Sequence, residues 1–219
     1  MQNVEYRKVP IWNGWLRLSH WSIALSSLAL IASGWLVAQS PYLHAPAQAT
    51  HNIAAGVLVF GLLLRIVLFF TGKNQLALTA LVPARAEREN MKAMLKFYIT
   101  LGKAPLPHWY AQNPLWKPLY LLLYVVLIVL AVSGMLLPEN TAIAGFFPRA
   151  IHRYWAEFVF WFTLLHIASV LLHDYRGETN DISAMVHGNK LFDAGRNVIQ
   201  NGPVKTDSIV QRIDINDIK

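Results

Sequence analysis

Hydrophobic residues are concentrated in four long runs that are separated by polar connections. The runs cover residues 21–38, 53–70, 119–137 and 154–172, and each contains few charged side chains. A helix needs about 20 consecutive apolar residues to cross the hydrocarbon core of a bilayer, and each run approaches that length. The pattern predicts an all-α membrane protein built as a bundle of four transmembrane helices.

The remaining segments are polar and carry weaker signals. Residues 87–100 have helical composition, with Met91, Met94, Leu95, Tyr98 and Ile99 on one apolar side, and this predicts a helix along the membrane surface. Residues 182–192 predict a short surface helix. We expect residues 1–192 to form the transmembrane domain and residues 193–219 to be a weakly ordered polar tail.

Composition narrows the chemistry that this chain can hold. Of its residues 55% are hydrophobic and 14% are charged, which is too apolar for an ordinary soluble domain. The chain has no cysteine. This excludes disulfides, iron–sulfur clusters and thioether-attached haem within the chain, so any haem must be held non-covalently.

The net charge of +7 is distributed unevenly along the chain. Residues 39–50 contain no Lys or Arg, and residues 138–151 contain only Arg149, whereas residues 71–118 contain seven basic residues. By the positive-inside rule, the long middle connection and both termini are cytoplasmic, and an even number of spans agrees. This placement indicates a membrane topology signal rather than a surface for nucleic acid.

Two histidines in the fourth run give the first indication of function. His152 and His166 are fourteen residues apart, which is about 40° short of four full helical turns, so both leave one helix face. Their separation along the axis is about 21 Å. A lone histidine on such a helix is more often a packed core residue. Two on one face suit two stacked haems, one near each side of a bilayer.

The other runs offer a partner at each depth. His20 lies at the cytoplasmic end of the first run, and His51 lies at the outer end of the second. Depth therefore pairs His51 with His152 and His20 with His166, and each pair would give a six-coordinate haem suited to electron transfer. His173, which shares the face of His166, is an alternative inner ligand or a border of the inner haem or a quinone. His44 is an alternative to His51, although it lies between prolines in a predicted loop over residues 39–50.

Basic and small residues stand beside these histidines. Arg17 would neighbour the inner haem, and Arg153 the outer one, where each would bind a propionate; Arg153 has an alternative i,i+4 partner in Glu157. We expect the Arg65 side chain either to extend toward the membrane interface or to contact a haem propionate. Ser33-Gly34 and Ser133-Gly134 occur near the outer ends of the first and third runs, and both would flank an outer cofactor.

The chain resembles the di-haem cytochrome b subunits of membrane-bound nickel–iron hydrogenases. These belong to a wider group with bacterial cytochrome b561 and the gamma subunit of formate dehydrogenase. The resemblance spans residues to about 192. It is carried by His51 and by three short motifs: Arg17-Leu18-Ser19-His20-Trp21, Ile151-His152-Arg153 with His166, and Ile182-Ser183-Ala184-Met185-Val186-His187-Gly188.

The resemblance implies a function and its partners. It implies two haems b with His20, His51, His152 and His166 as axial ligands. It also implies electron flow from a periplasmic iron–sulfur small subunit, attached to a catalytic large subunit, to ubiquinone or menaquinone in the lipid of a bacterial inner membrane. Relatives hold quinone at the cytoplasmic side, where Gln112, Asn113 and His173 are the candidates; helix capping is an alternative role for Asn113.

Other functions remain open at this stage. A formate dehydrogenase-type gamma subunit, or a free-standing cytochrome b561 that exchanges electrons with quinone, would keep the haems and change the partner. A haem-free membrane anchor or transporter would use the histidines in a proton path. The first three runs contain no Asp or Glu, which argues against a carboxylate-based relay in them.

Overall fold

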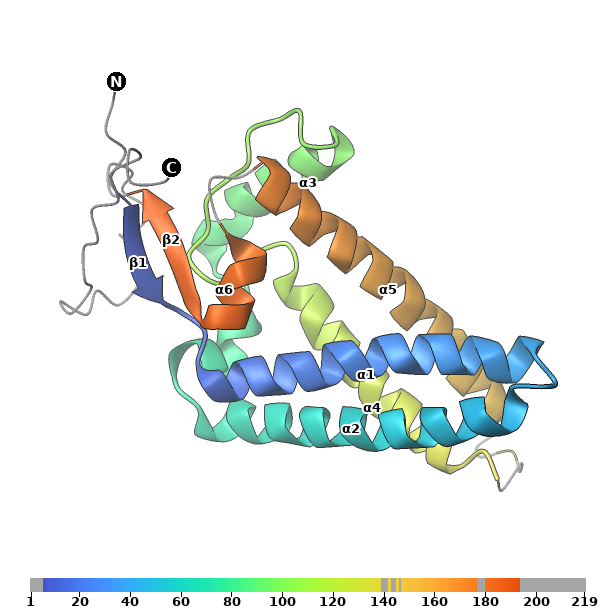
Figure 1. Ribbon diagram of the computed structural model, residues 1–219. Coiled ribbons are helices and arrows are strands. Elements are labelled where there is room, and N and C mark those ends of the chain that lie inside the picture. The colour runs from blue at the N-terminus through green and yellow to red at the C-terminus, as the bar shows by residue number, and fades with distance from the viewer. Residues whose placement is uncertain (1–5, 139–141, 143–144, 146, 177–179, 194–219) are drawn as a thin grey trace, which may run out of the picture. The chain divides into compact units, whose positions relative to one another are not determined.

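The structure is a computed structural model that describes residues 6–138, 142, 145, 147–176 and 180–193. The predicted tail beyond residue 193 and most of the connection after the third run, residues 138–147, lie outside these residues. Helices dominate the described part (Figure 1). In chain order its main elements are β1 (Tyr6–Pro10), α1 (Gly14–Gln39), α2 (His44–Thr71), α3 (Arg88–Ile99), α4 (Lys117–Met135), α5 (Pro148–Arg176), α6 (Asp181–His187) and β2 (Asn189–Asp193).

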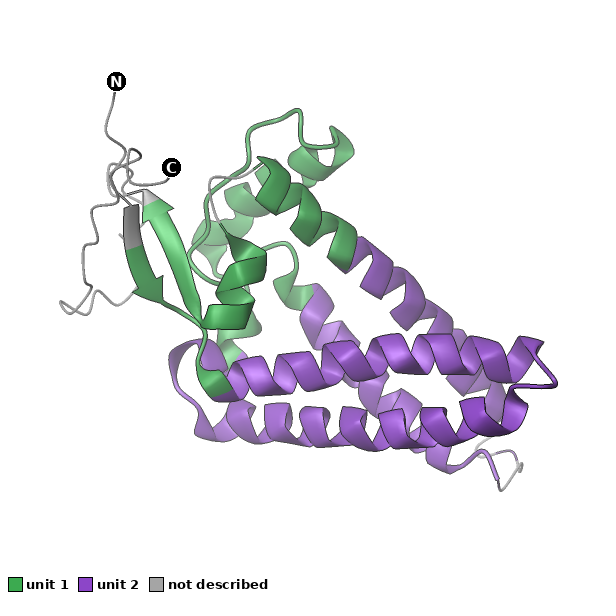
Figure 2. Cartoon of the chain, viewed as in Figure 1, with its two compact units in different colours: residues 1–14, 79–118, 167–219 green, residues 15–78, 119–166 purple. Residues whose placement is uncertain are grey.

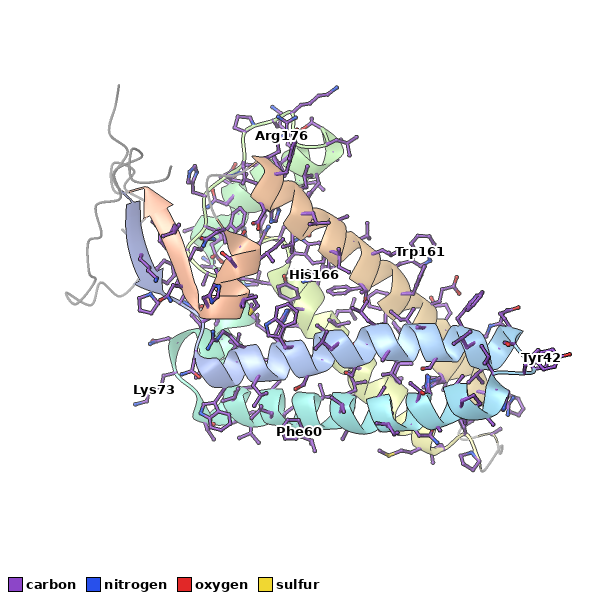
Figure 3. The ribbon with its side chains drawn as sticks, in the orientation of Figure 1. Tyr42, Phe60, Lys73, Trp161, His166 and Arg176 are labelled. Atoms are coloured by element: carbon purple, nitrogen blue, oxygen red, sulfur yellow. The ribbon has the colours of Figure 1, made fainter. Side chains whose placement is uncertain are left out.

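The all-α membrane fold is confirmed. The helices α1, α2, α4 and α5 are each long and apolar enough to cross a membrane, and they contain the four predicted runs almost completely. Many of their large apolar side chains are exposed, among them Phe60, Trp161 and Leu165 (Figure 3). Exposed aromatic and aliphatic side chains on this scale would be costly in water, whereas in a bilayer they face lipid. The chain is a multi-pass membrane protein.

The chain divides into two compact units (Figure 2). One contains most of the four long helices, residues 15–78 and 119–166, and is called the helical unit here. The other contains residues 1–14, 79–118 and 167–219 and is called the polar unit. Each is described by itself below.

The core of the helical unit is built from three helices. Leu58 and Leu62 of α2 pack with Val126 and Leu127 of α4 and with Val159 of α5, and all five side chains are buried. The helix α1 packs closely on α2, because a Cβ atom placed on Gly61 would lie only 2.8 Å from the Cβ of Ser22. A glycine at this position lets the two backbones approach.

The second long helix begins earlier than the sequence pattern predicts. We expected a loop over residues 39–50 and a span that starts at His51, but α2 begins at His44. The loop prediction is wrong because Pro46, which would break a helix in its interior, lies in the first turn of α2. Proline within the first turn leaves no hydrogen bond unmade, since the first amides of a helix have no partner within it. Only residues 40–43 remain as the connection to α1.

The polar unit contains a small antiparallel sheet that the sequence did not predict. The strands β1 and β2 pair along their whole length, from Tyr6 opposite Asp193 to Pro10 opposite Asn189. The predicted helix over residues 182–192 was only half right, since α6 ends at His187. Gly188 ends it with φ of 89°, and its carbonyl accepts hydrogen bonds from the amides of Ile11 and Trp12.

The predicted helix over residues 87–100 is present as α3, with a different buried face. Met94 and Phe97 are fully buried against Trp109, whereas Leu95 and Ile99 are exposed. The helix therefore packs into its unit through a narrow stripe. Its remaining apolar side chains are left on the surface, as a helix at a membrane interface requires.

Candidate functional site

The four predicted haem-ligand histidines all lie in the helical unit, where they form two pairs. The ring centroids of His51 on α2 and His152 on α5 are 6.4 Å apart, with 62° between the ring planes. Those of His20 on α1 and His166 on α5 are 6.5 Å apart, with 64° between the planes. The structure thus brings together the pairs that depth predicted, and three helices supply them.

The spacing in both pairs leaves room for one metal atom between two imidazoles. A metal–imidazole bond is about 2.0–2.1 Å long for zinc, and iron is similar. An imidazole nitrogen lies roughly 1.1 Å from its ring centroid, given ring bonds of about 1.3–1.4 Å. Two imidazoles on opposite sides of one iron therefore have centroids about 6.3 Å apart. Both observed separations fall close to that value, although no group of three or more His, Asp and Glu able to hold a bare ion occurs in the described residues.

Hydrogen bonds fix which nitrogen of His51 can bind a metal. Nδ1 of His51 is 3.0 Å from the Ser33 hydroxyl, and that hydroxyl donates its single hydrogen to the Ala29 carbonyl at 2.6 Å. The hydroxyl oxygen must therefore accept from the ring, so Nδ1 carries the proton. The lone pair on Nε2 is then available to a metal.

His152 is held in the same way by the other hairpin. Its Nδ1 is 3.1 Å from the Leu130 carbonyl and 3.1 Å from the Ser133 hydroxyl. A carbonyl can only accept, so Nδ1 of His152 is also protonated and Nε2 is presented to a ligand. The sequence analysis does not identify these contacts of Ser33 and Ser133. The signal for them is the Ser-Gly repeat, which predicts small residues beside an outer cofactor and gives no role to the hydroxyls.

Glycines next to these serines let the imidazoles approach the helices. A Cβ atom on Gly34 would lie 3.4 Å from Cε1 of His51, and one on Gly134 would lie 3.2 Å from Cε1 of His152. Each ring therefore rests on the backbone of the neighbouring helix. This support limits rotation of the imidazole, which a ligand held at fixed geometry requires.

The His20–His166 pair has aromatic surroundings. The ring of His166 stacks on Phe162 at 6.1 Å between centroids and meets the edge of Tyr120 at 5.9 Å. The ring of His20 meets the edge of Trp21. The two pairs therefore differ in character, since hydroxyl and carbonyl oxygen atoms contact the His51–His152 pair and aromatic rings contact the His20–His166 pair.

The candidate propionate-binding arginines have three different environments. Arg17 is partly buried in the first turn of α1, three residues before His20. Arg153 is exposed next to His152 and forms no ion pair with Glu157, which is exposed as well. Arg65 is buried, donates to the Leu76 carbonyl at 2.9 Å and lies 4.2 Å over the Phe69 ring, so neither snorkelling nor a free propionate contact describes it.

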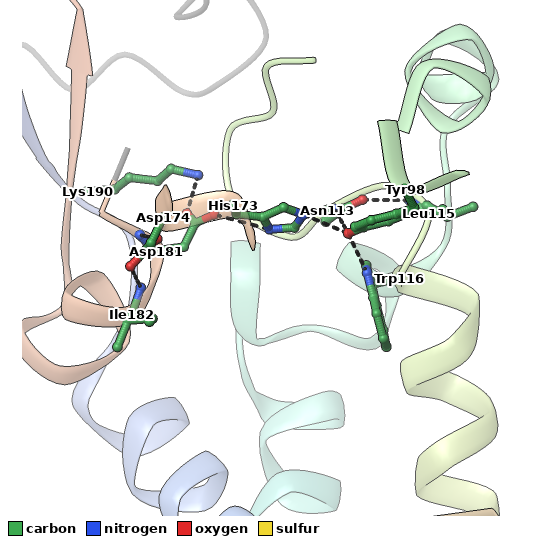
Figure 4. Close-up of polar contacts among 9 residues, drawn as sticks. All are labelled: Tyr98, Asn113, Leu115, Trp116, His173, Asp174, Asp181, Ile182 and Lys190. Carbon is green, nitrogen blue, oxygen red and sulfur yellow. Dashed lines mark hydrogen bonds and ion pairs between the residues drawn. The ribbon is translucent and has the colours of Figure 1, made fainter. Parts of the chain in front are cut away.

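His173 belongs to a hydrogen-bonded cluster in the polar unit (Figure 4). The Tyr98 hydroxyl is 2.7 Å from its Nε2 and accepts hydrogen bonds from Trp116 Nε1 at 2.8 Å and Asn113 Nδ2 at 3.2 Å. Trp116 and Asn113 can only donate at those atoms, so they fill both lone pairs of the hydroxyl, and its proton is left for Nε2 of His173 and for Ser169, which also hydrogen-bonds the hydroxyl. This leaves His173 no nitrogen for a haem in the structure, because Nδ1 faces Asp181.

A carboxylate and a buried lysine complete the cluster. Asp181 Oδ2 is 3.8 Å from Nδ1 of His173, and Asp181 Oδ1 is 2.8 Å from Nζ of Lys190, which is 2% exposed. Lys190 also lies 4.8 Å over the Trp109 ring. Burial raises the pKa of the Tyr98 hydroxyl to about 12, against hydrogen bonds that act in the opposite sense. The Tyr98 hydroxyl therefore keeps its proton at neutral pH and remains a hydrogen-bond donor.

The other predicted quinone residues and the alternative ligand are also located. Asn113 is buried, and its Oδ1 accepts from the Leu115 amide at 3.0 Å, which is the capping role considered as an alternative. Gln112 is half-buried beside it. His44 is exposed at the first residue of α2, whereas His51 two turns later faces His152.

Comparison with known proteins gives one match. A family model described as prokaryotic cytochrome b561 matches residues 11–188, which is most of the chain and includes all four paired histidines. No curated protein and no solved structure matches the chain.

Proposed function

Because this chain belongs to the prokaryotic cytochrome b561 family, and is therefore a transmembrane b-type cytochrome of electron transfer, we propose that it carries electrons through two haems b to membrane quinone. In this proposal His51 and His152 hold the outer haem, and His20 and His166 hold the inner one. The electrons come from a periplasmic iron–sulfur protein in a bacterial inner membrane.

The observation that carries the proposal is the spacing of the two histidine pairs. Both centroid separations match two imidazoles on one iron, and the angle between ring planes is unrestricted because each plane only has to contain the iron–nitrogen axis. Haem b supplies one-electron chemistry at iron when it is bound. In each pair the two histidines would hold the haem iron between them and would leave no position for substrate, as an electron carrier requires.

The two pairs lie at different depths along one helix. His152 and His166 are both on α5, and fourteen residues of helix correspond to about 21 Å. That distance divides the membrane into two shorter electron-transfer steps. Arg17 and Arg153, each next to a paired histidine, are proposed to bind propionates.

The Tyr98 cluster supports quinone reduction on the cytoplasmic side. Reduction of a quinone to a quinol consumes protons as well as electrons. Tyr98 hydrogen-bonds Nε2 of His173, His173 holds a proton at Nδ1, and Asp181 faces that nitrogen. We propose that quinone binds next to Asn113, Gln112 and His173, and that this cluster supplies its protons.

The electron donor is proposed to be a nickel–iron hydrogenase, with its iron–sulfur small subunit docked on the periplasmic side. The support is the motif resemblance, which extends to the segment Ile182–Gly188. A formate dehydrogenase-type complex would use the same surface. The haem-free anchor or transporter is not carried further, because the family binds b-type haem.

A free-standing quinone oxidoreductase is the second candidate. The description of the matched family, prokaryotic cytochrome b561, specifies no partner subunit, and a chain that acts alone fits it as well. Purification in a mild detergent separates the two. Co-purification of an iron–sulfur protein supports the complex, whereas an isolated chain with full quinone turnover supports the second candidate.

Haem extraction from the purified chain tests the proposal directly. We expect two extractable haems b per chain and a reduced-minus-oxidised spectrum whose amplitude agrees with that number. Addition of a soluble quinone to the reduced protein should reoxidise both haems. Fewer than two haems per chain, or haems that quinone leaves reduced, would contradict the proposal.

A further inference from the structure

The helical unit contains two copies of one small arrangement, which the proposed function does not by itself require. The helix α1 carries Leu30-Ile31-Ala32-Ser33-Gly34, and α4 carries Leu130-Ala131-Val132-Ser133-Gly134. In each hairpin the serine contacts Nδ1 of a histidine on the next transmembrane helix, 18 residues later for His51 and 19 for His152. The pair α1–α2 and the pair α4–α5 thus repeat the same contact.

The backbone completes each copy. The carbonyl of Leu130 lies 3.1 Å from Nδ1 of His152, and the backbone of Leu30 hydrogen-bonds His51. Both serines are buried, with exposures of 3% for Ser33 and 5% for Ser133. The Nδ1 proton of His152 is therefore shared between the Ser133 hydroxyl and the Leu130 carbonyl, and both serine–histidine contacts lie away from water.

Such hydrogen bonds act on a metal through the imidazole. A ring that donates from Nδ1 gains negative charge at Nε2 and becomes a stronger ligand, which stabilises the oxidised metal over the reduced one. Low polarity around the ring strengthens the effect. Both histidines of the His51–His152 pair donate from Nδ1 in this way, whereas aromatic rings contact the His20–His166 pair.

We propose that Ser33 and Ser133 are positioning residues that fix the Nδ1-protonated form of His51 and His152 and lower the reduction potential of the haem between them. The inference rests on the proposed function, because it needs that haem. It adds that the two haems differ in how the protein sets their reduction potentials. The haem that the serines serve is held at a lower potential than its ligands alone would give, which favours onward electron transfer toward the His20–His166 pair.

Redox titration of the full chain in detergent tests this inference. In Ser33→Ala and in Ser133→Ala we expect two haems to remain bound and one haem to become easier to reduce. Because the Leu130 carbonyl still accepts the Nδ1 proton of His152 in Ser133→Ala, the change should be modest, roughly twofold to tenfold in the ratio of reduced to oxidised haem at a fixed potential. The double variant should shift the same haem further.

Two further variants serve as controls. Ser133→Thr keeps the hydroxyl and should have the reduction potentials of the natural protein. If Ser133→Ala loses haem and Ser133→Thr retains it, the hydroxyl is needed to hold the haem. Ser26→Ala is matched to Ser33→Ala, because Ser26 is equally buried on α1 and bonds the carbonyls of Ser22 at 2.6 Å and Ile23 at 3.1 Å. It should change neither potential.

The outcomes separate this inference from the proposed function. Two haems with potentials that neither alanine variant alters would overturn the inference and leave the proposed function standing. An equal shift in Ser26→Ala would overturn it as well, since the effect would then not depend on the histidine contact. If replacement of His51 and His152 leaves the haem content of the chain unchanged, both the inference and the proposed function are overturned.

Discussion

At the scale of single residues, the closeness of two glycines to the paired imidazoles can be tested by adding one methyl group. In Gly134→Ala the new Cβ would lie 3.2 Å from Cε1 of His152, which is tighter than ordinary contact, so the ring must shift. In Gly34→Ala the corresponding distance is 3.4 Å. We expect Gly134→Ala to lower haem content or alter the haem spectrum more than Gly34→Ala does. Equal and unchanged spectra would contradict the described support of the rings.

The environment of Tyr98 predicts that the free energy of unfolding falls at alkaline pH. Its pKa is raised by burial to about 12, above the ordinary value of 10.0, so the unfolded chain loses the phenolic proton first. The stabilisation is fully present below pH 10 and is lost as the pH rises toward 12. Thermal unfolding measured across this range should show the loss in the natural protein, beyond that in Tyr98→Phe.

The same substitution should be costly at neutral pH. Tyr98→Phe removes the acceptor of the buried Trp116 and Asn113 donors, and an unsatisfied buried donor costs about 1–3 kcal/mol. A lower midpoint of thermal unfolding at pH 7 is therefore expected. An unchanged midpoint would mean that the hydroxyl is not the centre of the cluster.

At the scale of elements, the contact between α1 and α2 depends on Gly61. A Cβ there would lie 2.8 Å from Ser22 and 3.2 Å from the backbone nitrogen of Ile23, so Gly61→Ala must push the helices apart. Gly56 is the matched control on α2, because a Cβ there meets nothing within 4 Å. We expect Gly61→Ala to lower the thermal stability of the purified protein, and Gly56→Ala to leave it unchanged or slightly raised through helix propensity.

The four long helices could be predicted because each is a single apolar run that carries its own signal. The first and last residues of other elements could not be predicted in this way. The start of α2 at His44 depends on proline being harmless in a first helical turn, which the loop prediction ignored. The pairing of β1 with β2 joins residues almost at opposite ends of the chain, and neither strand has more than five residues, so no local pattern indicates it.

The pairing of the four histidines could be predicted because it depends on helical period and depth. His152 and His166 share a face of one helix, and each meets the histidine assigned to its depth. The roles of Ser33 and Ser133 depend on hydrogen bonds between helices, which sequence spacing does not give. The same holds for Tyr98, whose hydroxyl organises a cluster of residues from distant segments although the sequence assigned it only to an apolar helix face.

At the scale of the whole molecule, the charge distribution predicts the orientation of the helices in the membrane, and this prediction can be tested directly. The chain has no cysteine, so single cysteines can be introduced and labelled without a background. Tyr42, in the connection between α1 and α2, and Lys73, just after α2, are both exposed and lie at opposite ends of that hairpin (Figure 3). In intact spheroplasts, a membrane-impermeant thiol reagent should label Tyr42→Cys and should reach Lys73→Cys only after the membrane is opened. The reverse pattern would place the termini outside.

The most direct test of the central claim is the haem content of single and double histidine variants. We predict that His51→Ala and His152→Ala each remove the same haem, so their double variant still retains one haem per chain. Combining His51→Ala with His20→Ala should remove both haems, and His44→Ala or His173→Ala should remove neither. A double variant of His51 and His152 that loses both haems, or either single variant that keeps two, would contradict the pairing.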